Sequence, residues 1–321
     1  MRRILLVTGG IVAALLAALY LNNASWLAPG PHGERYFVAH RGVHQTFPHG
    51  DIKADDCTAE MIYPPTHRYL ENTIASMQAA FDVGAEIVEL DIHPTTDGDF
   101  AVMHDWTLDC RTDGEGVTRQ QTMAYIRTLD AGYGYTADGG RTYPLRGTGV
   151  GAIPSLGEVL DAFPDRRLLI NFKSNAAAEA DLLSAYLEAR GEDLSRLMVY
   201  GGANPTARFI ALHPQVRGFS RSSILDCLPR YIALGWSGYM PKTCRHTIAV
   251  VPKNYARLMW GWPARFIQRM NAAETDVFLL GDWDGNSDFS TGVDVRESVD
   301  ALPAGYTGGV WTNRIEGMGA R

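Results

Sequence analysis

From residue 36 onward, short apolar runs of strand length alternate with longer segments whose apolar positions recur at helical spacing. Eight runs have the length and composition of buried strands: YFVAH, IVELDI, FAVMH, LLINF, LMVY, VRGFS, DVFLL and GGVWT. Candidate helices include ENTIASMQAAFDVG, TMAYIRTLD, SLGEVLDAF and AAAEADLLSAYLEARG, the first of which ends at the glycine Gly84. Continuous apolar strands interleaved with helices are typical of a parallel sheet covered by helices.

The eight strand candidates predict a TIM (β/α)8 barrel over residues 36–321, and the length of the chain suits that fold. A doubly wound open sheet is the alternative. No GxGxxG or GxxxxGK[ST] motif stands at a strand end, so nucleotide-binding versions of the open sheet lose support. The choice matters, because barrel enzymes place their catalytic groups at the carboxyl ends of the strands.

The beginning of the chain has a different pattern. The apolar run ILLVTGGIVAALLAALYL follows Arg2 and Arg3, and it is roughly as long as the shortest helices that cross a bilayer. No Lys or Arg follows before Arg35, so the positive-inside rule places the rest of the chain in the periplasm. We therefore expect an inner-membrane anchor at residues 1–22 and a tether at residues 23–35. A cleaved signal peptide is the rival interpretation, although its apolar region is usually shorter.

Composition and charge restrict the function further. A chain of 321 residues that is 46% hydrophobic can form one large core. A formal net charge of -7 without a basic stripe argues against a nucleic-acid partner. The four cysteines show no CxxC spacing, which disfavours a zinc ribbon or a thioredoxin-type site.

In an oxidising compartment four cysteines suggest two disulfides. Cys227 and Cys244 lie at the two ends of a short segment, and we expect a disulfide between them to close it. Cys57 would then pair with Cys110 by elimination. The sequence alone allows three pairings, and four free buried thiols are the structural alternative.

Polar or titratable residues stand at the ends of the first four predicted strands: His40 and Arg41, Glu89 and Asp91, His104 and Asp105, Asn171 and Lys173. Residues two apart in a strand face the same way, so the ExD pair and the NxK pair can each point to the barrel axis. Two carboxylates and an amide oxygen there form an all-oxygen site, which suits Ca²⁺ or Mg²⁺ better than zinc.

The remaining strand-end residues can bind an anion and transfer protons. Arg41 and Lys173 can hold an anion, and an arginine can grip phosphate through two parallel hydrogen bonds. One of His40 and His104 can take a proton from a nucleophile while the other gives one to a leaving group. Each feature alone has a structural explanation. Together they are a set suited to phosphoryl transfer, in which metal and cations spread the transition-state charge.

The segments AHRG, ENT, VELDIHPTTDG and MHDWTLDCRTDG, with the lysine that ends the fourth strand, closely resemble the glycerophosphodiester phosphodiesterase family. The resemblance covers roughly the first half of the chain after the anchor and the closing GGVWTNR. It implies a TIM barrel that cleaves phosphodiesters with one divalent cation, Ca²⁺ or Mg²⁺. The roles it implies are catalysis by His40 and His104, phosphate binding by Arg41 and Lys173, metal binding by Glu89 and Asp91, and a place beside this cluster for Glu71.

One departure from the family pattern falls on the metal site. Asn171 stands where the family usually has a glutamate, so the site loses one negative charge. An amide oxygen can still bind a hard cation, but the affinity should fall unless Glu71 or water compensates.

Two features bear on the rim of the barrel. The insertion 42–70 and the DWTLDC segment should lie over the catalytic face, where a bridge between Cys57 and Cys110 would join them. Trp311, at the end of the last strand, is the tryptophan most expected to touch substrate.

Three functions remain open. The leading hypothesis is an anchored, metal-dependent phosphodiesterase that hydrolyses glycerophosphodiesters, or related lipid or glycan phosphodiesters, to glycerol phosphate and an alcohol. The same site could instead form a cyclic phosphate from a lysophospholipid or transfer phosphoglycerol to a glycan. A non-catalytic barrel that binds lipid headgroups or glycans is the third hypothesis, and Asn171 is the only feature in its favour.

Overall fold

The computed structural model describes residues 2–28, 33–48, 52, 56–285 and 291–319. Eight parallel strands of this part form one sheet in the hydrogen-bonded order β6-β5-β4-β2-β1-β9-β8-β7. Their bounds are β1 Tyr36–His40, β2 Ala85–Pro94, β4 Arg167–Phe172, β5 Leu197–Gly201, β6 Arg217–Ser220, β7 Ile248–Pro252, β8 Asp276–Leu280 and β9 Gly309–Thr312.

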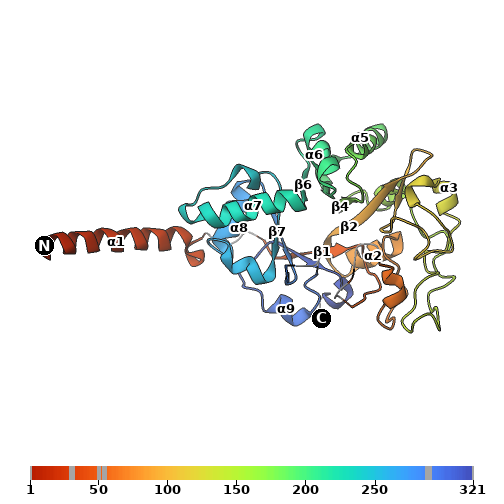
Figure 1. Ribbon diagram of the computed structural model, residues 1–321, viewed down its shortest axis with the longest axis horizontal. Coiled ribbons are helices and arrows are strands. Elements are labelled where there is room, and N and C mark those ends of the chain that lie inside the picture. The colour runs from red at the N-terminus through yellow and green to blue at the C-terminus, as the bar shows by residue number, and fades with distance from the viewer. Residues whose placement is uncertain (1, 29–32, 49–51, 53–55, 286–290, 320–321) are drawn as a thin grey trace.

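The two edge strands of this sheet, β6 and β7, lie beside each other. The hydroxyl of Thr247, just before β7, donates to the carbonyl of Gly218 in β6 at 2.8 Å. The sheet therefore curls into a nearly closed barrel (Figure 1), and the predicted TIM-barrel fold is confirmed.

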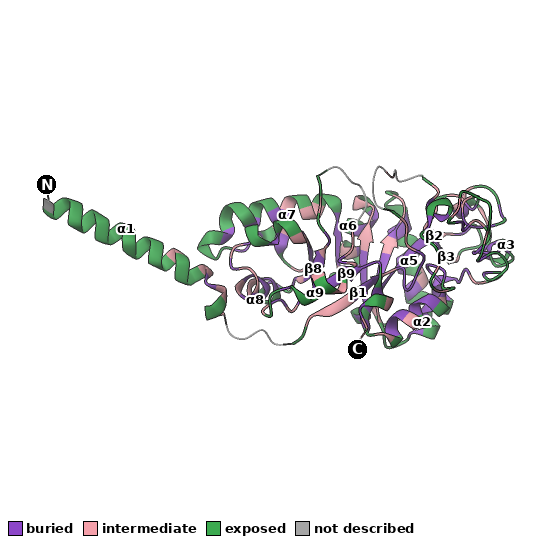
Figure 2. Ribbon diagram, turned by 90° about the horizontal axis from the view of Figure 1, so that it is seen from below, coloured by how far each residue is buried: buried purple, intermediate pink, exposed green. Residues whose placement is uncertain are grey.

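Helices follow the strands and cover the outside of the barrel, while most residues of the strands themselves are buried (Figure 2). Their bounds are α2 Ile74–Asp82, α4 Leu156–Ala162, α5 Ala178–Arg190, α6 Ala203–Leu212, α7 Arg221–Leu234, α8 Ala264–Ala272 and α9 Arg296–Asp300, with the short α3 Met123–Ile126 in the connection before α4. The helix α2 starts where the ENT segment ends, because the Thr73 side chain accepts a hydrogen bond from the Ser76 amide and completes a capping box.

One predicted barrel strand is wrong. FAVMH forms β3 (Phe100–Val102), which runs antiparallel to the end of β2 and is not part of the barrel wall. The pair is a hairpin that turns at TTDG, where Gly98 takes a φ of 84° that glycine adopts without strain. The missing barrel strand is β7, whose sequence IAVVP was not among the eight candidates.

Both predicted disulfides are present. Cys57 and Cys110 are joined with an S–S distance of 2.08 Å, and Cys227 and Cys244 with 2.01 Å. The first ties the insertion 42–70 to the segment that follows β3. The second closes the connection between α7 and β7.

The N-terminal helix α1 (Arg2–Asn23) projects away from the barrel (Figure 1), and none of its candidate span Arg3–Asn23 is buried. It is long and apolar enough to cross a bilayer, a property that a signal sequence shares. The segment expected to be a tether starts with residues that contact the barrel: Ala24 is buried, and the Ser25 hydroxyl accepts a hydrogen bond from the Ala264 amide at the start of α8. Residues 29–32 of the expected tether lie outside the described part of the chain.

Candidate active site

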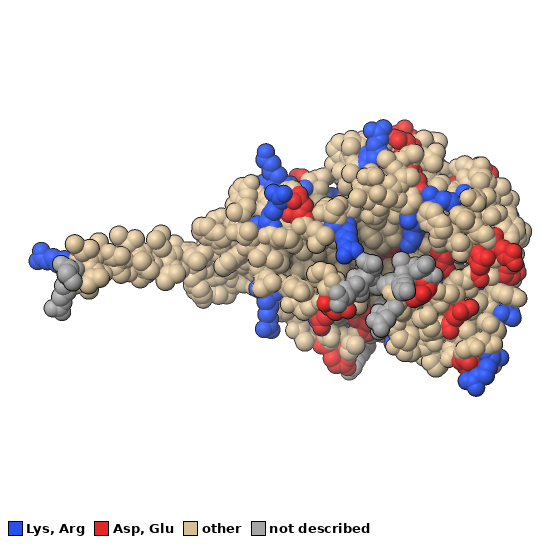
Figure 3. Space-filling view, in the orientation of Figure 1, with Lys and Arg blue, Asp and Glu red and all other residues tan. Residues whose placement is uncertain are grey.

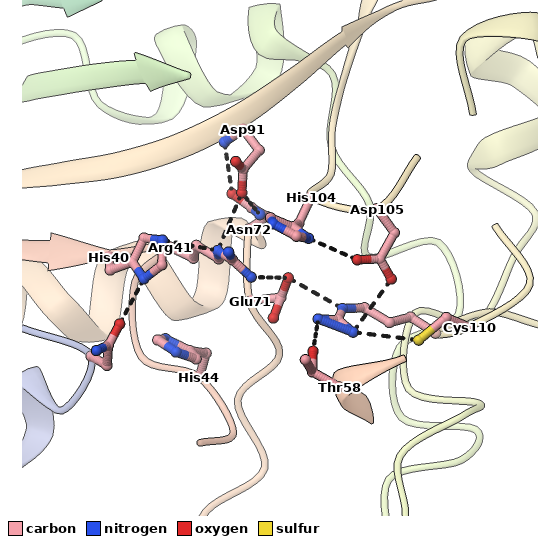
Figure 4. Close-up of polar contacts among 12 residues, drawn as sticks. His40, Arg41, His44, Thr58, Glu71, Asn72, Asp91, His104, Asp105 and Cys110 are labelled. Carbon is pink, nitrogen blue, oxygen red and sulfur yellow. Dashed lines mark hydrogen bonds and ion pairs between the residues drawn. The ribbon is translucent and has the colours of Figure 1, made fainter. Parts of the chain in front are cut away.

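The strand-end residues expected at the site converge at one end of the barrel. The Cα register pairs His40 of β1 with Glu89 of β2, and Asp91 of β2 with Asn171 of β4. Glu89 and Asp91 are completely buried. The ends of three adjacent strands therefore bring these side chains together, and Figure 4 shows His40 and Asp91 with their polar neighbours.

His40 is held in one tautomer by two neighbours. The Arg41 Nε–H donates to His40 Nε2 at 3.2 Å, so Nε2 carries a lone pair and Nδ1 carries the proton. The Nδ1–H group donates to Asn313 Oδ1 at 2.6 Å. Burial and the nearby Arg41 charge lower the pKa of His40 well below its usual value, which keeps the ring neutral. His40 therefore presents an unprotonated Nε2 to the site.

Asn313 is itself oriented by a carboxylate from the connection between β8 and β9. Its Nδ2 donates to Asp294 Oδ2 at 2.9 Å, and its backbone amide donates to Asp294 Oδ1 at 2.6 Å. The amide oxygen is thereby turned toward His40. Asp294 fixes Asn313, and Asn313 fixes His40.

Arg41 lies at the centre of the cluster. Its backbone has a φ of 59°, in the left-handed region, and its amide donates to Glu89 Oε2 at 3.1 Å. Its guanidinium is 3.2 Å from Glu71 Oε1 through Nη1 and 3.4 Å from Asp91 Oδ2 through Nε. A buried arginine between two carboxylates is charge-neutralised on both sides.

The two carboxylates of β2 have opposite protonation tendencies. Burial, reinforced by the charge of Asp91, raises the pKa of Glu89 to about 8. Burial also opposes ionisation of Asp91, but Lys173 and Arg41 outweigh it and hold the Asp91 pKa well below its usual value. The Tyr200 hydroxyl, from the end of β5, donates to Glu89 Oε1 at 2.6 Å.

His104 sits on the far side of Arg41 and Asp91 from His40 (Figure 4). The hairpin strand β3 delivers it, and its Nδ1 is 2.8 Å from Asp105 Oδ1. Burial and the charges of Arg41 and Lys173 lower the pKa of His104. Its ring partner is a carboxylate, whereas the ring partner of His40 is a neutral amide.

A second buried arginine, Arg111, joins the two halves of the site. Its Nε is 3.2 Å from Glu71 Oε1, and its Nη1 is 3.4 Å from Asp105 Oδ2. Its Nη2 donates to the Thr58 hydroxyl at 2.8 Å, so the insertion 42–70 contacts the site as expected. Against the opposing effect of burial, Arg111 lowers the pKa of both Glu71 and Asp105.

The predicted metal ligands are only partly arranged as such. Asn171 donates its Nδ2 to Asp91 Oδ1 at 2.8 Å, so its oxygen points away from the carboxylate pair. Glu71 is occupied by the two arginines. Among the described residues, no three His, Cys, Asp or Glu side chains form a group that could hold a metal ion. Glu89 and Asp91 remain the pair whose oxygens suit a hard cation.

The two remaining predicted residues, Lys173 and Trp311, differ in exposure. The Lys173 Nζ is 3.5 Å from Asp91 Oδ1 and is partly exposed, so it can still reach a ligand at the mouth. Trp311 is 1% exposed and lies inside the barrel, with its ring centroid 5.1 Å from that of His40. Its contact with substrate stays a prediction.

Sequence reasoning missed Asn72, whose Nδ2 donates to Asp91 Oδ2 at 2.9 Å. It also missed Arg111, Tyr200, Asp294 and Asn313. Two of them end a strand, and the rule that selected His40 would have selected Tyr200 and Asn313 too. Arg111 lies within the quoted DCRTDG segment. Asp294 is in a connection that has no sequence signal.

Fold and site define a class: a TIM barrel with a buried cluster of histidines, arginines and carboxylates at the carboxyl ends of its strands. Comparisons of sequence identify the family. The profile of the glycerophosphoryl diester phosphodiesterase family matches residues 40–197. The chain therefore belongs to the glycerophosphoryl diester phosphodiesterase family.

Several curated relatives carry the name glycerophosphodiester phosphodiesterase. The one from Caldanaerobacter subterraneus subsp. tengcongensis is 38% identical over 105 residues, or 32% of this chain and 39% of its own length. The one from Bacillus subtilis is 41% identical over 96 residues, or 29% of this chain and 31% of its own length. The matched segment thus spans two-fifths or less of these relatives.

Solved structures match over nearly the whole chain at low identity. A glycerophosphoryl diester phosphodiesterase domain from Mycobacterium tuberculosis has a TM-score of 0.61 at 18% identity, covering 88% of this chain and 97% of that one. An Oleispira antarctica phosphodiesterase in complex with the product sn-glycerol-3-phosphate has a TM-score of 0.56 at 17% identity, covering 92% and 97%. These similarities support the shared barrel fold.

Proposed function

We propose that this chain is a metal-dependent phosphodiesterase that hydrolyses glycerophosphodiesters to glycerol phosphate and an alcohol. The observation that carries the proposal is the placement of two histidines, His40 and His104, on opposite sides of Arg41 and Asp91 (Figure 4). A phosphodiester between them has one proton acceptor on the side of the nucleophile and one proton donor on the side of the leaving group.

The charge balance of the site supports a divalent cation. The buried carboxylates Glu71, Glu89 and Asp91 and the half-buried Asp105 face Arg41, Arg111 and Lys173, and burial together with the charge of Asp91 raises the pKa of Glu89. A cation held by Glu89 and Asp91 would relieve this repulsion and leave the site with net positive charge for an anionic phosphodiester. When bound, such an ion polarises the phosphoryl oxygens. Both Mg²⁺ and Ca²⁺ suit these oxygen ligands.

The partners of the two rings assign their roles. His40 Nε2 is unprotonated and its Nδ1 donates to a neutral amide, so His40 is the base that takes a proton from water. His104 has the carboxylate of Asp105 at its Nδ1, which stabilises a protonated ring once an anionic substrate is bound. His104 is therefore the acid that protonates the leaving alcohol.

The function is tested with purified full-length protein and glycerophosphocholine. We expect glycerol phosphate and choline as products, loss of turnover in EDTA, and recovery with Mg²⁺ or Ca²⁺. His40→Ala and His104→Ala should each lower turnover roughly 100-fold or more. His246→Ala should not, because His246 lies just before β7 and pairs with Glu274. A cyclic phosphate product by mass spectrometry would refute hydrolysis, and undiminished turnover in EDTA would refute the metal requirement.

A substrate with a good leaving group distinguishes the general acid from the general base in kinetics. A p-nitrophenyl phosphodiester needs no protonation of its leaving group, so His104→Ala should retain far more activity on it than His40→Ala does. Preferential retention by His40→Ala would reverse the assignment.

We further propose that α1 anchors the catalytic domain to the inner membrane, with the barrel in the periplasm. Figure 3 shows a shaft free of charged residues, with Lys and Arg only near its N-terminal end. At about 1.5 Å per residue the 22-residue helix is ~33 Å long, enough for a hydrocarbon core of ~30 Å. Two disulfides fit an oxidising compartment. Two measurements distinguish an anchor from a cleaved signal peptide. They are flotation of the protein with membranes after high-salt washing and the intact mass of the purified protein.

A further inference from the structure

The junction between α1 and the barrel is built from specific polar contacts. The side chains of Asn22 and Asn23, in the last turn of α1, both donate to the backbone carbonyl of Trp236, at 3.0 and 2.8 Å. Arg269 of α8 donates to Asn23 Oδ1 at 3.0 Å and to the Asn22 carbonyl at 2.8 Å. The helix is thus fixed to the barrel at the connection between α7 and β7.

Large exposed aromatic side chains gather around this junction. Trp26 is 70% exposed and donates through Nε1 to the hydroxyl of Tyr20, which is 61% exposed. On the barrel side, Trp236 is 49% exposed and Tyr239 is 51% exposed. Two segments separated by more than 200 residues therefore place two Trp and two Tyr at the end of one apolar helix.

The same region has the charge of a surface that lies against lipid headgroups. Between Cys227 and Cys244 the sequence has Arg230, which pairs with Asp226 at 2.6 Å, and the exposed Lys242, but no Asp or Glu. The exposed Leu234, at the end of α7, precedes Trp236 by two residues. Basic side chains next to exposed aromatic ones favour contact with the headgroups of anionic lipids.

We propose that this aromatic surface, formed by Tyr20, Trp26, Trp236 and Tyr239, lies in the headgroup layer of the outer leaflet of the membrane that α1 crosses. Trp and Tyr are enriched at that depth because the ring is apolar and its N–H or O–H group still reaches water. The span of α1 ends at Asn23, so Trp26 and the Trp236 connection lie where the hydrocarbon core gives way to headgroups.

The consequence is a barrel with a fixed orientation on the membrane. The contacts of Asn22, Asn23 and Arg269 prevent α1 from acting as a free tether. The disulfide between Cys227 and Cys244 closes the connection between α7 and β7, which contains the Trp236 carbonyl that Asn22 and Asn23 bind. The catalytic domain would rest on the bilayer through the end of α7, with its orientation set by this surface. The inference rests on the proposed anchoring by α1.

The test uses the tryptophans as depth probes, because residues 1–22 contain none. Full-length protein is placed in vesicles of phosphatidylethanolamine and phosphatidylglycerol that contain a lipid brominated near the headgroup end of its acyl chain. We expect Trp fluorescence to be quenched, Trp26→Phe and Trp236→Phe each to lower the quenched fraction, and the double variant to lose most of it. Trp106→Phe is the matched control, because Trp106 is 47% exposed, contacts the ring of His93 and lies outside the surface.

The outcomes separate this surface from the anchor. Equal quenching of wild type and the double variant, in vesicles that carry the protein to the top of a density gradient, would overturn the surface and leave the anchor intact. Failure of the wild-type protein to float would overturn both. Thermal unfolding in detergent verifies that the variants are folded.

Discussion

The orientation of His40 by Asp294 gives the most specific prediction. Replacing Asp294 with alanine removes no group near the phosphodiester, yet it frees the amide of Asn313, whose Nδ2 now donates to Asp294 Oδ2 at 2.9 Å. A freed amide can rotate and offer Nδ2 to His40 Nδ1. His40 would then need its other tautomer, with a proton on Nε2, where Arg41 Nε–H already points at 3.2 Å.

The expected loss of activity follows from removal of the hydrogen bond between the Asn313 side-chain amide and Asp294. A hydrogen bond to a charged group contributes about 1.5–3 kcal/mol, and this is the free energy that keeps the amide in its productive orientation. If that preference is lost in the transition state, kcat falls roughly 10- to 100-fold. KM should change little, because neither Asp294 nor Asn313 is placed to contact the phosphate.

The assay is a double-mutant cycle in steady-state kinetics. Asn313→Leu removes the bond to His40 directly, so the double variant with Asp294→Ala should be no slower than Asn313→Leu alone. Thr312→Val removes another bond to Asp294, at 3.1 Å, without reaching His40, and serves as the control. ¹⁵N spectra of the histidine ring should show protonated Nδ1 in wild type and a mixture of tautomers in Asp294→Ala. Additive losses, or an unchanged tautomer, would refute the relay.

Three further predictions concern the charged cluster. Asn171→Glu restores a carboxylate beside Asp91 and should tighten Mg²⁺ or Ca²⁺ binding by about tenfold, measured by calorimetry; unchanged affinity would mean that position 171 is not a ligand. The pKa of Glu89 is raised to about 8, so the stability contributed by its protonated form is lost as pH rises through that value. Glu89→Gln should therefore unfold at higher urea than wild type at pH 9 in EDTA, with the difference vanishing below pH 5; a constant difference would contradict this. Arg111→Met leaves Glu71 and Asp105 without a partner and should cost about 3–5 kcal/mol in urea unfolding, whereas a cost near zero would show that these pairs contribute little.

The sequence predicted the barrel and the core of the site because both depend on local pattern. Apolar runs mark the strands, and side chains two residues apart share a face, so Glu89 and Asp91 had to point together. The error at β3 has a physical cause: FAV is as apolar as a barrel strand, and only the TTDG turn before it distinguishes a hairpin from a crossover. The missed strand β7 is a run of five residues ending at Pro252.

Other parts of the site could not be predicted from pattern. Arg41 has a left-handed backbone with a φ of 59° and pairs with Glu71 and Asp91, and no periodicity encodes either feature; phosphate binding by Arg41 stays a prediction. The contact of Asp294 with Asn313 joins the β8–β9 connection to the end of β9. The sequence placed Asn171 at the site beside Asp91. It could not show that the Asn171 side chain donates its Nδ2 to Asp91 instead of presenting its oxygen to a metal ion.

The charges of the site also imply that metal and substrate bind together. With Glu89 protonated, the carboxylates of Glu71, Asp91 and Asp105 balance Arg41, Arg111 and Lys173, and Arg41 is already paired with Glu71 and Asp91. A phosphate that approaches this cluster alone therefore meets no net positive charge. A divalent cation that displaces the Glu89 proton makes the site net positive and lets Lys173 turn from Asp91 to the ligand. Glycerol phosphate should therefore bind the EDTA-treated protein far more weakly than the metal-loaded protein, and by linkage it should tighten the metal by the same factor.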